Sequence, residues 1–122
     1  MISGIFVAKQ GPVVPPILRD VGGREHTLSA IVDTGFTGWL TLPPKIISAL
    51  GINYEEQTLA VLADGTPTLF DTYRVTVLWD GQPQTVFVDE LESEPLVGIR
   101  LLHGFRLVME TVDGGPVRIE RM

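Results

Sequence analysis

The chain is organised around one stretch, Leu28–Gly35 with the sequence LSAIVDTG, which continues as Phe36–Pro43 with the sequence FTGWLTLP. Its apolar first part predicts a buried strand, which would give rigid support to the residues after it. Asp33 is the only carboxylate in the stretch, and Thr34 places a hydroxyl donor and acceptor beside it. Gly35 allows a sharp turn and the close approach of a ligand or another chain. An aspartate after a strand is also typical of a plain turn, so the surrounding sequence has to decide.

The composition is that of one folded domain spanning residues 1–122. A chain of this length buries roughly two thirds of the surface that its unfolded state exposes. There is no cysteine, which excludes disulfides and cysteine metal sites and is compatible with a reducing compartment. His26 and His103 lie far apart without suitably spaced partners. We therefore expect no metal and no cofactor.

The charge pattern argues against two classes of partner. The formal net charge is −6, and the nine Lys and Arg residues are scattered rather than clustered, which argues against nucleic acid. The amino-terminal residues do not have the pattern of a signal peptide. No segment approaches the ~18 consecutive apolar residues that read as a membrane span. The expectation is a soluble, cytoplasmic protein that binds neither nucleic acid nor membrane.

Turn signals divide most of the chain into short strands. Asp64-Gly65, Asp80-Gly81 and Asp113-Gly114-Gly115 are typical hairpin turns flanked by apolar stretches. Pro15-Pro16 restricts its segment to an edge or interrupted strand. The expected strands are Ile2–Ala8, Val13–Asp20, Tyr73–Trp79, Thr85–Asp89, Leu107–Val112 and Val117–Glu120. Many short strands at close spacing favour a small barrel or sandwich.

One good helix is expected after the opening stretch. Pro43-Pro44 would open it, because proline is tolerated in a first helical turn. Ile46, Ile47 and Leu50 would form its apolar face, and Gly51 would end it. A second short helical turn is possible around residues 99–103.

Two further segments each allow two interpretations. Gln57–Tyr73 is a hairpin with an Ala-Asp-Gly tip, which is either an ordinary solvated hairpin or a mobile flap that covers a ligand. Pro95–Gly98 is an apolar run ending in glycine, which is typical of a buried strand packed closely against another backbone. Taken alone, it is plain core.

The order of these parts resembles the retropepsin-like aspartic peptidases, the single-domain relatives of pepsin, and above all their small bacterial members. The resemblance covers nearly the whole chain. It rests on Val32–Phe36, Leu40–Pro43, Ala63–Gly65 and Gly114-Gly115, which recur in this order in that family. It implies a mostly-β fold, a small closed acid-protease barrel with one short helix and a flap hairpin.

The resemblance also implies a role for each part of the site. Asp33 would be catalytic, with Thr34 and Gly35 supporting the active-site loop and Thr34 bonding to the loop of a partner subunit. Phe36 would contribute to the substrate floor. The flap tip would be Ala63, Asp64 and Gly65, and the residues packed behind the loop would be Leu96, Val97 and Gly98.

Peptide hydrolysis by this route needs two carboxylates that share one proton, one acting as general base and the other as general acid. The chain has a single Asp-Thr-Gly. Asp71-Thr72 lacks the glycine, and the acids at the hairpin turns lack the hydroxyl neighbour. The second aspartate must then come from another copy, in a two-fold homodimer with Asp33 of each subunit at the axis. A monomer is expected to be inert.

The sequence departs from the family pattern at three places. The arginine that usually follows the Leu-Val-Gly run is displaced by one position in Ile99-Arg100, which affects an expected dimer contact. Phe36 replaces a small residue after Asp-Thr-Gly, which bears on substrate range. Asp64 adds negative charge at the flap tip.

Three functions are therefore compared. The first is an aspartic endopeptidase that acts on peptide or protein substrates as a homodimer. The second is a catalytically weak or inactive dimer of the same fold that binds peptides or proteins. The third is a structural β domain in which Asp33 is only a turn acid.

Overall fold

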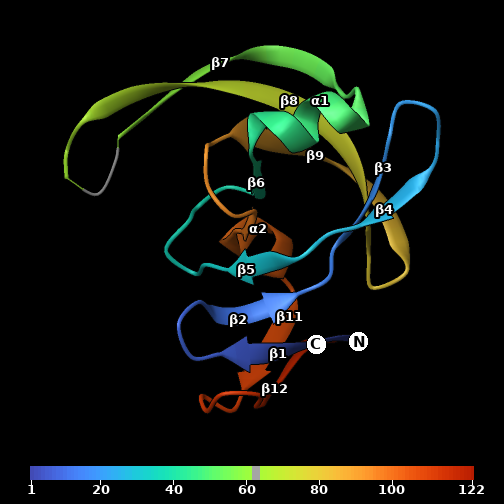
Figure 1. The fold of residues 1–122 in the computed structure, drawn as a ribbon, viewed down its shortest axis with the longest axis vertical. Coiled ribbons are helices and arrows are strands. Elements are labelled where there is room, and N and C mark those ends of the chain that lie inside the picture. Colours follow the sequence, from blue (N-terminus) through green and yellow to red (C-terminus); the bar gives the residue numbers. More distant parts are fainter. Residues whose placement is uncertain (62–63) are drawn as a thin grey trace.

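The computed structural model describes residues 1–61 and 64–122, which form a mostly-β protein, as predicted (Figure 1). The two helices are α1 (Pro44–Leu50) and α2 (Ile99–Leu102). The strands are β1 (Ile2–Val7), β2 (Gly11–Val14), β3 (Ile17–Arg19), β4 (Glu25–Thr27), β5 (Ala30–Val32), β6 (Leu40–Leu42), β7 (Asn53–Val61), β8 (Pro67–Trp79), β9 (Gln82–Glu90), β10 (Leu96–Val97), β11 (Phe105–Met109) and β12 (Pro116–Arg121). Neither helix is long and apolar enough to cross a membrane, judged over the described residues.

The strands belong to one sheet with the order β11-β12-β1-β2-β5-β10-β6-β9-β8-β3-β4, and β7 pairs with β8 off this path. This order is open, because the pairings within residues 1–61 and 64–122 do not join β11 to β4. The expected closed barrel is therefore not found. Among the described residues, the edge strands β11 and β4 pair only with β12 and β3, respectively.

The centre of the sheet holds the segment that carries Asp33. β10 lies between β5 and β6, parallel to the first and antiparallel to the second, and β6 is parallel to β9. Val32, Leu40, Val88 and Val97 from these four strands belong to one buried apolar core. This packing stabilises the strand end from which the Asp33 loop emerges.

Local signals predicted several boundaries correctly. Helix α1 has Pro43 in extended conformation before it and Gly51 in the left-handed region after it (φ 63°), and it buries Ile47 and Leu50. Pro15 and Pro16 separate β2 from β3, because proline lacks the N–H that a continuous strand would need. Helix α2 occupies the short helical turn expected around residues 99–103.

The hairpin of β7 and β8 arches over α1 and β9 and projects beyond the rest of the sheet (Figure 1). Its register pairs Thr58 with Phe70 and Leu59 with Leu69, so alternate side chains face opposite sides. Ala63, expected at the tip, lies outside the described residues.

Candidate active site

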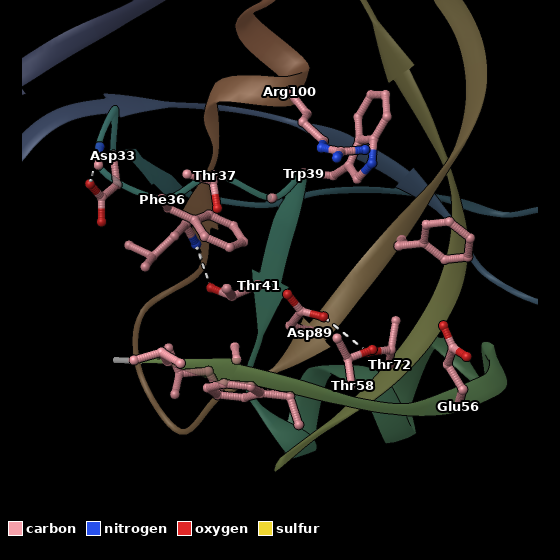
Figure 2. A pocket seen from close by; sticks show the side chains of 18 residues that line it. Asp33, Phe36, Thr37, Trp39, Thr41, Glu56, Thr58, Thr72, Asp89 and Arg100 are labelled. Atoms are coloured by element: carbon pink, nitrogen blue, oxygen red, sulfur yellow. Dashed lines mark hydrogen bonds between the residues drawn. The ribbon is translucent and has the colours of Figure 1, made fainter. Parts of the chain in front are cut away.

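A cleft of about 550 Å³ lies between the Asp33 loop, the β7–β8 hairpin and the ends of the central strands. Figure 2 shows Asp33 at one end of the cleft, with Asp89, Thr72 and Thr58 grouped away from it and Arg100 beside Trp39. The other lining residues that bear on the chemistry are Phe36, Thr41, Glu56, Phe70, Phe87 and Leu96. The cleft thus combines aromatic and aliphatic walls with a few polar groups, as ligand sites usually do.

Three hydrogen bonds hold the Asp33 loop. The Asp33 N–H donates to the Val97 carbonyl at 2.9 Å, which ties the loop to β10. The Gly35 N–H donates to Asp33 Oδ1 at 2.9 Å, and the Phe36 N–H donates to the Asp33 carbonyl at 3.1 Å. The Asp33 side chain is half-buried, while Thr34 and Gly35 are exposed. One carboxylate oxygen is therefore held in place while the residue remains partly open to the cleft.

The residues expected behind the loop lie there. Val97 is fully buried and pairs with Val32 and Leu40, while Leu96 lines the cleft. The Gly98 N–H donates to the Trp39 carbonyl at 2.9 Å, so the turn after β10 runs along the loop between β5 and β6. The Ile99 and Arg100 N–H groups continue this contact, donating to the carbonyls of Phe36 and Gly38.

The close backbone approach expected at Gly98 is found, whereas Gly35 is not constrained in the same way. Gly35 does not have a positive φ, and a Cβ there would meet only Asp33 Oδ1 at 3.3 Å. A Cβ on Gly98 would lie 2.1 Å from the Gly38 carbonyl oxygen, and one on Gly38 would lie 2.6 Å from the Phe36 ring. The Phe36 ring therefore packs over two glycines while also lining the cleft. Gly98 is therefore the position where only glycine fits, because its Cβ would meet backbone, whereas a Cβ at Gly38 would require the Phe36 ring to move.

A second carboxylate that the sequence did not single out, Asp89, also lines the cleft. The buried Thr72 hydroxyl donates to Asp89 Oδ1 at 3.0 Å and lies 2.9 Å from the Thr58 hydroxyl. Burial raises the pKa of Asp89 above its ordinary value, and the hydrogen bond from Thr72 offsets part of the rise. The only sign in the sequence was that Asp89 ends an expected strand, which says nothing about its neighbours.

Asp89 is too far from Asp33 to serve as the second member of a dyad in the same chain. Asp89 pairs with Thr41, Thr41 with Leu96 and Leu96 with Ile31, and Asp33 lies two residues beyond Ile31. Strands lie ~4.8 Å apart, so three strand steps and two residues separate the two Cα atoms by roughly 15 Å. Carboxylates that share a proton lie about 3 Å apart. The fold therefore leaves Asp33 without a dyad partner at Asp89.

Of the flap residues of the hypothesis, Asp64 and Gly65 lie at the hairpin tip and do not line the cleft. Asp64 and Gly65 follow the end of β7, and Asp64 Oδ1 accepts from the Thr66 N–H at 2.9 Å. Hydrogen bonds from the Thr66 hydroxyl and N–H lower the pKa of Asp64. The hairpin residues that line the cleft are instead Glu56, Thr58, Ala60 and Val61 on β7, and Phe70 and Thr72 on β8. A role for Asp64 and Gly65 over the substrate stays a prediction.

The half-buried Asp89 carboxylate gives a pH-dependent prediction. Replacing Asp89 with asparagine is expected to raise the free energy of unfolding at about pH 7 and to leave it unchanged near pH 3. The folded-state pKa lies above the ordinary value of 3.8, so the folded state binds the proton more tightly. The stability that this tighter proton binding contributes is therefore fully present below pH ~3.8 and is lost as the pH rises through the pKa of Asp89 in the folded state.

Asparagine keeps an acceptor for Thr72 but carries no charge that burial penalises, so the gain at neutral pH should reach at most about 1 kcal/mol at this half-exposed site. Thermal unfolding at the two pH values measures it. Glu110→Gln, at an exposed position, makes the same charge change and should show no such pH dependence. An equal effect of Asp89→Asn at both pH values would contradict a raised pKa of Asp89.

Comparisons of this chain with protein-family models, curated proteins and solved structures gave no match. Within the described residues, no group of three or more His, Cys, Asp or Glu is arranged to hold a metal ion. A function must therefore be argued from the cleft and from the resemblance of the motifs.

Proposed function

We propose that the protein is an aspartic endopeptidase of the retropepsin-like kind, active as a homodimer in which two Asp33 carboxylates activate one water. The observation that carries the proposal is the half-buried Asp33 at one end of the 550 Å³ cleft, with one oxygen held by the Gly35 N–H. The ordered set of family motifs supports it. So does the cleft itself, which is lined by the hairpin on one side and by the Asp33 loop on the other.

The proposed chemistry uses the two carboxylates in opposite protonation states. The ionised Asp33 takes a proton from the water, whose oxygen attacks the peptide carbonyl carbon. The protonated Asp33 of the second copy donates to the carbonyl oxygen, so a neutral tetrahedral diol forms. The carboxyl that took the water's proton then donates it to the amide nitrogen, while the ionised Asp33 of the second copy takes a proton from a diol hydroxyl, so the carbon–nitrogen bond breaks and an acid and an amine are released. The two carboxyls end the cycle sharing one proton, as at its start.

The exposed position of the loop supports the proposed dimer. Thr34 and Gly35 are exposed in the single chain, and a two-fold axis through this loop would bring the two Asp33 side chains together. In that arrangement the Thr34 hydroxyl would bond to the partner's loop. The β7–β8 hairpin would act as the flap, and a peptide would lie beneath it as an extended strand.

Mixing of subunits tests whether two Asp33 residues are needed for one site. Asp33→Asn protein is added in equal amount to wild-type protein, and peptide cleavage is measured after the subunits have exchanged. If both copies contribute, only about a quarter of randomly formed dimers keep two Asp33 residues, and the activity per wild-type subunit falls by about half.

The matched control adds Glu110→Gln subunits, which keep Asp33, so the activity per subunit that carries Asp33 should stay unchanged. An activity that is unaffected by Asp33→Asn subunits would mean that each copy works alone, and the two-aspartate mechanism would have to be abandoned.

A second candidate is a dimer of the same fold that binds peptides without cleaving them. The observation that favours it is Phe36, whose ring packs over Gly38 and Gly98 and occupies space in the wall of the cleft. This candidate requires peptide binding that survives Asp33→Asn, together with the absence of cleavage at any pH between about 3 and 7, the range in which aspartic dyads titrate and work.

A further inference from the structure

A second cavity of about 330 Å³ adjoins the cleft, and Trp39 and Arg100 belong to the walls of both. It lies where the end of β8, the start of β9, helix α2 and the last two strands meet. Phe105, Trp79 and Leu101 give it an apolar lining. The two side chains shared by both cavities therefore stand at the boundary between the cleft and this separate recess.

The charged side chains of this cavity are all basic, whereas the cleft also contains carboxylates. Arg100, Arg121 and His103 line it together with the amides of Gln82 and Gln84, and its described wall contains no carboxylate. Asp33, Glu56 and Asp89 belong to the cleft only. In a chain with a formal net charge of −6, a recess whose charged side chains are all basic is a local reversal of charge.

The two arginines of the cavity are not equivalent. Arg121 Nε lies 3.2 Å from Asp80 Oδ2, so its charge is already compensated, and its guanidinium stands over the Phe105 ring. Arg100 has no carboxylate within ion-pair distance among residues 1–61 and 64–122. Arg100 is therefore the charge in this wall that an anion can still neutralise.

Arg100 is also held in position before any ligand arrives. Its backbone N–H donates to the Gly38 carbonyl at 3.1 Å, and its guanidinium carbon lies 5.9 Å from the centre of the Trp39 ring. Figure 2 shows the side chain extended beside the indole. A guanidinium over an aromatic ring keeps its N–H groups free for a carboxylate.

We propose that Arg100 binds a carboxylate of a peptide ligand, from either an acidic side chain or a free carboxyl terminus, at the boundary between the cleft and the second cavity. Arginine binds carboxylates through two parallel N–H···O bonds, which suits this planar, stacked group. The site does not involve Asp33 and would operate in a peptidase or in a binding module.

Both tryptophans of the chain, Trp39 and Trp79, line this cavity, so their fluorescence reports on it directly. The experiment titrates Asp33→Asn protein, which cannot consume the ligand, with capped tetra-alanine peptides. One pair of peptides compares an internal glutamate with glutamine, and another compares a free carboxyl terminus with its amide. We expect one of the two carboxylate peptides to bind at least about tenfold more tightly than its neutral partner, as a charge-assisted hydrogen bond would give. The pair that shows the difference tells whether the carboxylate comes from an acidic side chain or from a free carboxyl terminus.

Arg100→Gln should remove this difference, and Arg100→Lys should keep only part of it, because lysine lacks the planar fork. Arg106→Gln is the matched control, since Arg106 is exposed on β11 and lines neither cavity. Thermal unfolding checks that each variant is folded.

Equal binding of charged and neutral peptides would overturn the proposal. A carboxylate preference that persists in Arg100→Gln would also overturn it. So would a dimer that dissociates in Arg100→Gln with no change in peptide binding, because Arg100 would then bind a carboxylate of the second copy. None of these results depends on cleavage, so a failure here is distinct from a failure of the proposed peptidase activity.

Discussion

Replacing Gly98 with alanine is expected to lower the free energy of unfolding by about 3 kcal/mol, at the upper end of the usual cost of overpacking. The new methyl group would lie 2.1 Å from the Gly38 carbonyl oxygen and 2.7 Å from the Phe36 ring. The ring can move, but the carbonyl cannot do so freely. The N–H groups of Gly98, Ile99 and Arg100 all bond to the loop of residues 36–39 and fix the two backbones against each other.

Urea denaturation followed by circular dichroism measures this effect. Gly22→Ala is the control, because a Cβ there would meet only Asp20 Oδ1 at an ordinary 3.4 Å, and φ is not positive. That variant should stay within about 1 kcal/mol of wild type. If Gly98→Ala were equally harmless, the close packing of the turn after β10 against the Asp33 loop would be wrong.

Replacing Asp33 with asparagine is expected to lower kcat/KM for peptide cleavage by about 10³-fold, in the range typical of losing a general acid–base group. Asparagine keeps the shape of the side chain and an oxygen that can accept from the Gly35 N–H, so the loop should remain in place. It cannot take a proton from water. The loss should therefore appear in kcat, with peptide binding largely retained.

The matched control is Asp71→Asn, which alters the other Asp-Thr dipeptide of the chain. Asp71 lies on β8 and does not line the cleft, and its one side-chain hydrogen bond, from Gln57, is long at 3.5 Å. Its activity should equal that of wild type, and a statine-type inhibitor should block both. Cleavage that survives Asp33→Asn would remove Asp33 from the mechanism and would point to a contaminating peptidase.

Features determined by neighbouring residues could be predicted from the sequence. The proline pair before α1 and the glycine after it set that helix, because each acts through its own backbone geometry. The interruption at Pro15 and Pro16, the position of Asp33 at a strand end and the hairpin between β7 and β8 follow in the same way. Taken together, these local signals predict the mostly-β class.

Features that depend on strand register could not be predicted. Thr58, Thr72 and Asp89 are brought together by the pairing of β7, β8 and β9, with a bulge near Tyr54 that shifts the register. No local pattern contains that information, since a shift of one residue would turn each side chain to the opposite face. Arg100 beside Trp39 depends in the same way on β10 lying between β5 and β6. The expected closed barrel was not found for a similar reason, because the pairing of two edge strands depends on contacts between residues that are far apart in the sequence.

The pairing of β1 with β12 has a consequence for how the protein is made. Ile2–Val7 is synthesised more than 100 residues before Pro116–Arg121, one of its two neighbours in the sheet. At the usual pace of translation, of about 5–20 residues per second, β1 waits roughly ten seconds for that partner. During this interval one of its edges is open, and open strand edges are where chains on neighbouring ribosomes pair wrongly. Yield in the cell should therefore depend on chaperone capacity more strongly than the stability of the finished fold would suggest.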